Sequence, residues 1–287
     1  MTLLLLALES ADSPAPPSPP PAPPCTVEML KQRPAGDKSW PIACSGTTLG
    51  TADTELDLSG ASLSYGDFTD AKFIGVRAIN LNGASLANAD LSDSKTLAYH
   101  DEDTYDELGA TIGFAGANLN NAKLTDANII ADASYSSTID FTGANLASAD
   151  LRGAKLRAST SYGELSSILF SEANLANADL SDAQLIATNY GDEGNALINF
   201  TNADLTNADL VEADFETLGS YGERVIDFTD AILADADFSG ATFQAGEDDG
   251  ERLIGLCVDT NLNKECQVSK CNKSFHKKHC KKTCSLC

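Results

Sequence analysis

The chain has 287 residues and a formal net charge of −23, with 42 acidic and 19 basic side chains. Residues 257–287 contain seven lysines against Asp259 and Glu265, so this end carries about +5 and the rest of the chain −28. So acidic a surface excludes direct binding of nucleic acid or anionic lipid by the main part of the chain. The simplest role of the acidic surface is to keep the protein soluble.

Residues 1–24 are expected to form a leader and a proline-rich linker. The apolar run from Leu3 to Leu8 has no basic residue before it and no small-x-small cleavage site after it, so it resembles an incomplete signal peptide. Residues 13–24 read SPAPPSPPPAPP and are predicted to be an extended polyproline II spacer. The spacer is either a plain linker, which we favour, or a glycosylated tether to a wall or matrix. No stretch is long enough to span a membrane.

Residues 25–50 are predicted to form an N-terminal cap, closed by a disulfide between Cys25 and Cys44. The loop between these cysteines contains the only tryptophan, Trp40, which would cover the first repeat with an aromatic lid. All eight cysteines are clustered near the two ends of the chain, an even number that indicates disulfides and an oxidising compartment. We therefore expect a secreted or extracellular protein, or one in the lumen of an endomembrane compartment.

A large apolar residue recurs every five positions between residues 51 and 245. The stretch from Ile139 to Leu156 shows the unit clearly, with central residues Phe141, Leu146, Leu151 and Leu156. A second apolar residue lies two positions before each of them, and Asp, Asn or Lys stands between. This period fits neither a helix nor a flat strand. It fits a right-angled coil whose two apolar residues point inward, so that four repeats close one square turn.

The repeat is similar to that of the pentapeptide-repeat family, which has Leu or Phe at the centre and a small residue two positions earlier. The resemblance covers about two thirds of the chain. It implies an all-β fold, a right-handed quadrilateral β-helix, and grouping the centres in fours gives about seven coils. Such a solenoid has no globular core, because each coil stacks on its neighbours, and its ends need caps. The family serves as a scaffold for several purposes, which include binding to DNA gyrase.

Extra residues interrupt the repeat at the same point in successive coils. From Thr96 onward, 12 to 18 residues separate the last centre of one coil from the first centre of the next. We therefore expect five loops at one corner of the solenoid. A tyrosine recurs in four of them, five or six residues past the last centre: Tyr135, Tyr162, Tyr190 and Tyr221. We interpret these tyrosines first as contacts between stacked loops; the alternative is an aromatic and acidic recognition ridge.

The outward positions of equal phase should form columns along the solenoid. One column is acidic in six of seven places, and consists of Asp67, Asp90, Lys123, Asp150, Asp179, Asp209 and Asp237. Stacked carboxylates repel, so the column needs an explanation. We rank first the hydrogen bonding of Asp or Asn side chains to backbone groups at the corners. Cation binding and mimicry of a phosphate backbone are the alternatives. Lys72, Lys95 and Lys155 on the adjoining face argue against the last.

Residues 246–256 are expected to be a cap or linker, and residues 257–287 a small disulfide-rich module. The spacing C-x8-C-x4-C-x8-C-x3-C-x2-C, with CVDT at its start and CKKTCSLC at its end, resembles the ShKT module of sea anemone toxins and many extracellular proteins. Sequence alone permits 15 pairings of six cysteines. The resemblance implies an α-helical module with the pairs Cys257–Cys287, Cys266–Cys280 and Cys271–Cys284.

The module departs from its channel-blocking relatives, which place a Lys followed by an aromatic residue on the helix before the fourth cysteine. No Lys in that segment is followed by an aromatic residue, so channel blockade is not expected. A basic interaction surface is expected from Lys273, Lys277 and Lys278. His276 and His279 lie near cysteines, but a sulfur held in a disulfide is not a metal ligand, and we expect no metal.

The sequence predicts no enzyme. It holds three histidines, no nucleophile elbow and no phosphate-binding loop, and a solenoid filled with Leu, Phe and Ala leaves no substrate pocket. We expect a non-enzymatic scaffold without cofactor, which presents the loop edge and a basic tip to a protein or glycan partner. The alternatives are an acidic nucleic-acid mimic that inhibits a DNA-binding protein such as a topoisomerase, and a structural wall or matrix protein. Asn199 and Asn272 lie in glycosylation sequons.

Overall fold

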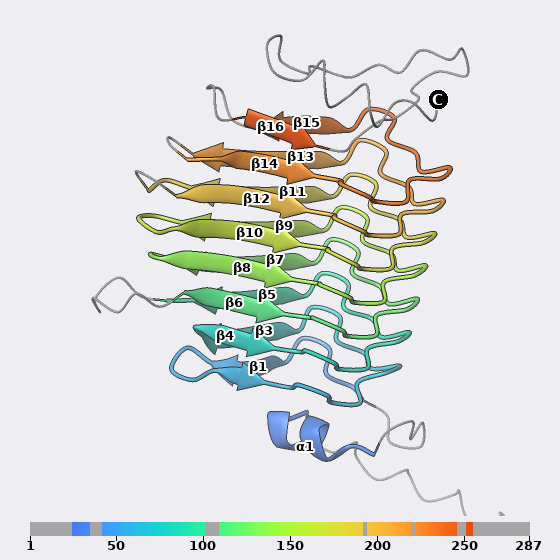
Figure 1. The fold of residues 1–287 in the computed structure, drawn as a ribbon. Coiled ribbons are helices and arrows are strands. Elements are labelled where there is room, and N and C mark those ends of the chain that lie inside the picture. Colours follow the sequence, from blue (N-terminus) through green and yellow to red (C-terminus); the bar gives the residue numbers. More distant parts are fainter. Residues whose placement is uncertain are drawn as a thin grey trace, which may run out of the picture.

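The structure is a computed structural model that describes residues 25–34, 42–100, 109–191, 194–219 and 222–245, together with the backbone of 251–254. Apart from one short helix, α1 (Val27–Gln32), its regular elements are parallel strands stacked along one axis (Figure 1). The fold is therefore an all-β parallel solenoid, as the repeat predicts.

The strands alternate between two eight-stranded parallel sheets. One sheet contains β1 (Thr48–Thr51), β3 (Lys72–Val76), β5 (Lys95–Tyr99), β7 (Asn128–Ala133), β9 (Lys155–Thr160), β11 (Gln184–Asn189), β13 (Asp214–Gly219) and β15 (Thr242–Ala245). The other contains β2 (Leu56–Asp57), β4 (Ala78–Asn80), β6 (Ala110–Gly113), β8 (Ser136–Asp140), β10 (Leu165–Leu169), β12 (Asn195–Asn199), β14 (Arg224–Asp227) and β16 (Glu251–Ile254).

Two further ladders, made of single-residue bridges, complete the circumference of each coil. One runs from Ser62 through Ser85 to Ile232, and the other from Ala43 through Asp67 to Asp237. The solenoid therefore has four parallel ladders, two of them sheets and two of them bridges. The second bridge ladder contains the whole acidic column, so the sequence predicts its vertical register correctly.

Apolar side chains of each coil stack on their equivalents in the next coil. Five phenylalanines form one such stack, with ring centroids 4.6–4.9 Å apart and ring planes within 4° of parallel: Phe114, Phe141, Phe170, Phe200 and Phe228. The leucine and alanine positions of the same coils are buried in the same way. Stability is therefore distributed along the axis as a series of contacts between neighbouring coils.

The corners are four-residue turns whose third residue has a positive φ, as a type II turn requires. Asn88 has φ 58° and lies in the turn closed by the bond from Ala89 N–H to the Leu86 carbonyl, 2.9 Å long. Gly143 has φ 63° at the third residue of another corner, in a later coil. Because Asn, Asp and Gly tolerate this conformation best, they recur at the last position of the five-residue unit.

The extra residues lie at one edge of the solenoid, but most of them are strand rather than loop. β7 and β8 are separated by only two residues, and β9 and β10 by four. The expectation of protruding loops is therefore wrong for this part of the edge. Here the strands of both sheets extend beyond the four-sided coil and are joined by short turns. Small hydroxyl side chains fill the narrow space between the sheets there, because Ser137 Oγ donates to the Ser159 carbonyl and Ser166 Oγ to the Thr188 carbonyl, both at 2.6 Å.

The N-terminal end of the solenoid is covered by α1. Thr26 caps the helix, with its Oγ1 accepting from Met29 N–H, and Leu30 is completely buried against the first coil. Arg33 donates to the carbonyls of Ser62 and Ser64, at 2.8 and 3.1 Å. A disulfide joins Cys25 to Cys44, with their Cα atoms 5.3 Å apart. Trp40 lies outside the described residues, so its expected position as a lid is not seen.

Candidate functional site

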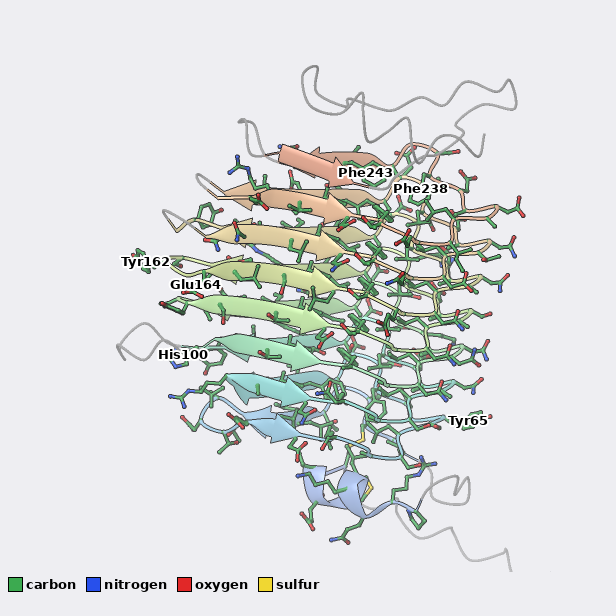
Figure 2. All side chains as sticks on the ribbon, in the orientation of Figure 1. Tyr65, His100, Tyr162, Glu164, Phe238 and Phe243 are labelled. Atoms are coloured by element: carbon green, nitrogen blue, oxygen red, sulfur yellow. A yellow bond between two sulfur atoms is a disulfide. The ribbon has the colours of Figure 1, made fainter. Side chains whose placement is uncertain are left out.

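The edge where β7, β9 and β11 turn into β8, β10 and β12 carries the exposed tyrosines, and we call residues 134–135, 161–164, 190–191 and 194 the turn edge. Tyr162 is 76% exposed and Tyr190 56% exposed, whereas Tyr135 is half-buried. Figure 2 shows Tyr162 and Glu164 at this edge, with Tyr65 on the opposite side of the solenoid. Tyr221 lies outside the described residues.

The tyrosines do not form one column. Ala133 pairs with Thr160, which places Tyr135 level with Tyr162. Thr160 pairs with Asn189, which places Tyr190 level with Ser161, one residue short of that column. Tyr162 and Tyr190 therefore differ by one residue in their position along the strand direction, and the side chains of both extend into solvent.

The backbones of successive turns lie directly on one another. Tyr162 N–H donates to the Ser134 carbonyl and Glu164 N–H to the Tyr135 carbonyl, both at 2.9 Å. Gly163 is buried at this contact, where an added Cβ would overlap the Tyr135 carbonyl group. The glycine that follows the tyrosine therefore allows the close approach of two backbones.

Asn189 fixes the next turn from inside, a role that the repeat pattern did not reveal. Its side chain is completely buried. Nδ2 donates to the carbonyls of Gly163 and Asn195 at 3.2 Å each, and Oδ1 accepts from Gly191 N–H at 2.9 Å. These bonds hold the turn that carries Tyr190 and join it to the turn that carries Tyr162.

The carboxylates of the acidic column accept hydrogen bonds from backbone N–H groups at the corners of the coils. Oδ1 of Asp179 accepts from Ser181 N–H at 3.0 Å, and Oδ1 of Asp209 accepts from Val211 N–H, also at 3.0 Å. The same bond to the second following residue is made by Asp67, Asp90, Asp150 and Asp237. The preference of the repeat for Asp and Asn at this position thus has a local structural cause, which is the explanation ranked first from the sequence.

The comparison with protein families agrees with this architecture. The profile described as pentapeptide repeats matches in eight copies, over residues 54–93, 138–160, 164–189 and 198–217. The chain is a pentapeptide-repeat protein with a β-solenoid fold. No curated protein matches it.

Three solved pentapeptide-repeat or related structures are similar to this pentapeptide-repeat solenoid. One is from the thylakoid lumen of Arabidopsis thaliana, 22% identical, covering 59% of this chain and 69% of that chain, with a TM-score of 0.24. Another is HetL from the cyanobacterium Nostoc, involved in regulation of heterocyst differentiation, 21% identical, with coverages of 74% and 88% and a TM-score of 0.24. The third is full-length QnrB1, a plasmid-mediated fluoroquinolone resistance protein, 16% identical, with coverages of 73% and 94% and a TM-score of 0.20. At these values the likeness says nothing about the function of this chain.

Two cations of the pentapeptide-repeat protein interrupt the acidic column. Lys123 Nζ lies 3.2 Å from Asp90 Oδ2. Arg152 reaches Asp150 at 2.6 Å and Asp179 at 3.5 Å, and so bridges two successive coils. These pairs are partly exposed, so each contributes little to stability, but they reduce the repulsion between neighbouring carboxylates.

The hydrogen bond from Arg152 lowers the pKa of the Asp150 carboxyl below its ordinary value. The pKa of Asp150 is lower in the folded protein than in the unfolded chain, so its ionised carboxylate stabilises the fold. This contribution is fully present above the unfolded pKa of about 3.9 and is lost as the pH falls through the folded pKa. We expect Arg152→Gln to raise the pKa of Asp150, measured by NMR titration of its carboxyl carbon. Arg157→Gln removes an exposed cation elsewhere and should leave that pKa unchanged; an equal shift in both variants would contradict the assignment.

Within the described ranges, no three His, Cys, Asp or Glu side chains are grouped so that they could hold a metal ion. No described helix combines the length and apolar character needed to cross a membrane. Asn199 ends β12, is half-buried, and accepts from Thr201 N–H at 2.8 Å. The remaining expected site residues lie outside the described ranges: Lys273, Lys277, Lys278, Asn272 and the six C-terminal cysteines.

Two buried polar side chains at the turn-edge side of the sheets were not anticipated. Arg224, at the start of β14, is 2% exposed, and its Nε and Nη1 have no hydrogen-bond partner among the described residues. His100, which follows β5, is 8% exposed, and its Nδ1 likewise has no partner in the described part of the chain. Neither belongs to the five-residue pattern, so no periodic signal in the sequence points to its burial.

Proposed function

We propose that this pentapeptide-repeat protein is a non-enzymatic binding scaffold outside the cytosol, which presents its turn edge and a basic C-terminal tip to a protein or glycan partner. The observation that carries the proposal is the exposure of Tyr162 and Tyr190 on a rigid edge. Only four large apolar or aromatic side chains are prominently exposed in the described residues, and two of them are these tyrosines. Exposed aromatics on a rigid support are typical of recognition surfaces.

The rest of the edge supports binding rather than catalysis. Gly163 and Asn189 fix the backbone beneath the tyrosines, so little conformational entropy is lost when a partner binds. The carboxylate of Glu164 is exposed beside Tyr162 and adds hydrogen-bond acceptors for a hydroxyl-rich or basic partner (Figure 2). The interior is filled with Phe, Leu and Ala, so the solenoid provides support and the edge provides contact.

The test compares binding by the full-length chain with binding by two variants, on a glycan array and against proteins of the compartment in which a tagged chain is found. Tyr162→Ala combined with Tyr190→Ala should weaken binding at least about tenfold, in line with the loss of two exposed aromatic contacts. Tyr65→Ala removes an aromatic that is 53% exposed on the opposite side and should leave binding unchanged. Equal binding by all three proteins would overturn the turn edge as the contact surface.

The extracellular or luminal placement is part of the proposal and is supported by cysteine usage. Cys25 and Cys44 are joined in the structure, and we propose the pairs Cys257–Cys287, Cys266–Cys280 and Cys271–Cys284 in an ShKT-like module. Disulfides of this number persist in oxidising compartments. Disulfide mapping by mass spectrometry of protein from its native source tests this; free thiols at the six C-terminal positions would remove both the module and the placement.

The acidic column is the feature that favours the alternative, inhibition of a DNA-binding protein by mimicry of nucleic acid. Its carboxylates stand in register along the axis. However, Lys123 and Arg152 interrupt the negative stripe, and the corner hydrogen bonds explain the Asp residues without a partner. A salt series separates the two functions, because mimicry of a phosphate backbone should weaken steeply with ionic strength.

A further inference from the structure

The two ends of the solenoid differ in how well they are covered. At the N-terminal end, α1 and the Cys25–Cys44 disulfide lie against the first coil, and the inward residues Leu56 and Leu58 are buried. At the C-terminal end, Phe228 and Phe238 are buried, but most inward side chains of the last coil are only partly buried: Ala231, Leu233, Ala236, Ala241, Phe243 and Ala245. The apolar face of the last coil is therefore open in the described residues.

The coil below shows what a covered face looks like. Phe215 pairs in register with Phe243, and the rings stack with centroids 4.9 Å apart. Phe215 is completely buried, whereas Phe243 is not. In the same way Leu205 is completely buried and Leu233, its equivalent in the last coil, is only partly so. The difference is that Phe215 and Leu205 have a further coil above them, whereas the described residues place none above Phe243 and Leu233.

The described residues also supply no backbone partners for the last coil on this side. Leu205 and Leu210 N–H donate to the carbonyls of Ile232 and Asp237 in the following coil, at 2.8 and 2.7 Å. The equivalent N–H groups of Leu233 and Phe238 point toward the open end, and the described part of the chain has no coil there to accept from them. β16 covers only the side above β14 (Figure 1). Buried backbone donors require partners, so this end needs a cap.

The rim of the open end is acidic. Asp230, Asp235 and Asp237 are exposed in the last coil. The segment that follows β16 begins at residue 255, directly beside this end, and continues for 33 residues. Its last 31 residues carry seven lysines against two acids, opposite in sign to the rim. It also contains apolar residues, among them Val268 and Phe275, which can cover Leu233 and Phe243.

We propose that residues 255–287 dock onto the C-terminal end of the solenoid and cap it. The apolar face formed by Leu233, Ala236 and Phe243 is the contact centre, and lysines of the segment pair with the acidic rim. The tether favours this occupant over any free partner, because a segment attached at the edge of the face has a high effective concentration there. The segment thus completes the solenoid as well as presenting a tip, and this role is independent of the turn edge.

The first test is carbodiimide crosslinking of the monomeric full-length chain, which joins a lysine directly to a carboxylate that it touches. We expect intramolecular crosslinks from Lys273, Lys277 or Lys278 to Asp230, Asp235 or Asp237, identified by mass spectrometry. Asp67 and Asp70, in a coil near the other end, serve as internal controls and should not crosslink to these lysines. Absence of rim crosslinks, or equal crosslinking to the control coil, would overturn the proposal.

The second test is hydrogen exchange of the same full-length chain. The amides of Leu233 and Phe238 should exchange at least about tenfold more slowly than in a variant with Lys273, Lys277 and Lys278 changed to glutamate, because charge reversal repels the segment from the rim. The control changes Lys72, Lys95 and Lys155 to glutamate on a side face, and should leave these amides protected. Rapid exchange in the unmodified chain, or protection that persists after reversal at the segment, would contradict docking. A dimer of the full chain that protects the same amides would assign the face to a second copy.

Discussion

Phe170→Ala is expected to lower the free energy of unfolding by about 3–5 kcal/mol, as other replacements of a buried Phe by Ala do. Phe170 is completely buried between the rings of Phe141 and Phe200, each 4.9 Å away. Removing it leaves a gap in the middle of the stack, and both neighbouring rings lose a face of contact. Neither the strands nor the tight corners can close the gap, because four ladders fix the distance between coils.

Chemical denaturation followed by circular dichroism measures this loss. Tyr162→Ala is the matched control, since it also removes an aromatic ring, but one that is 76% exposed. It should change the free energy of unfolding by no more than about 0.5 kcal/mol. A loss below about 1 kcal/mol for Phe170→Ala would mean that the stack does not carry the coil-to-coil contact.

Gly163→Ala is expected to destabilise the turn edge. The expected loss exceeds what the change in backbone conformational entropy of a Gly-to-Ala replacement can explain. The added Cβ would overlap the carbonyl group of Tyr135 in the neighbouring turn, and that backbone is itself held by its bond to Glu164. Two stacked turns must separate to admit the methyl group, with loss of their hydrogen bonds. We expect a cost of about 2–4 kcal/mol, in the range of severe overpacking combined with lost backbone bonds.

Gly143→Ala provides the control. Gly143 has φ 63° at a corner where an added Cβ meets nothing within 4 Å, so only the left-handed conformation is penalised, by about 1 kcal/mol. Hydrogen exchange locates the effect: the amides of Tyr162 and Glu164 should lose protection in Gly163→Ala and keep it in Gly143→Ala. Equal costs in the two variants would show that the turns do not need the close approach.

The sequence predicts the solenoid well because a five-residue period is a geometric constraint that every coil repeats. The stack from Phe114 to Phe228 and the column from Asp67 to Asp237 both follow from equal phase, and both are present in the structure. The role of Asp at the corners is also predictable. A short carboxylate next to a turn is well placed to accept a hydrogen bond from the backbone N–H two residues further on.

The turn edge is less predictable, because its residues follow no five-residue rule. The segments were expected to be loops, yet they continue the sheets, and the signal that could have shown it is the alternation of small hydroxyl residues such as Ser137, Ser166 and Thr188. These residues are too small and polar to be recognised as a core. The spacing of Tyr190 is one residue shorter than that of Tyr162, and strand register shows the consequence: Tyr190 lies level with Ser161 and outside the column.

The helix at the N-terminal end limits how copies of this protein can associate. Growth of a fibre requires two unlike surfaces, one at each end, that fit each other in every successive copy. Here α1 occupies one of them, so a second copy cannot extend the stack from that side. The docked segment proposed above covers the other end in the same way, so neither end offers a bare coil to a second copy. A molecule built from exposed repeats and sheet edges is thereby protected from unlimited polymerisation.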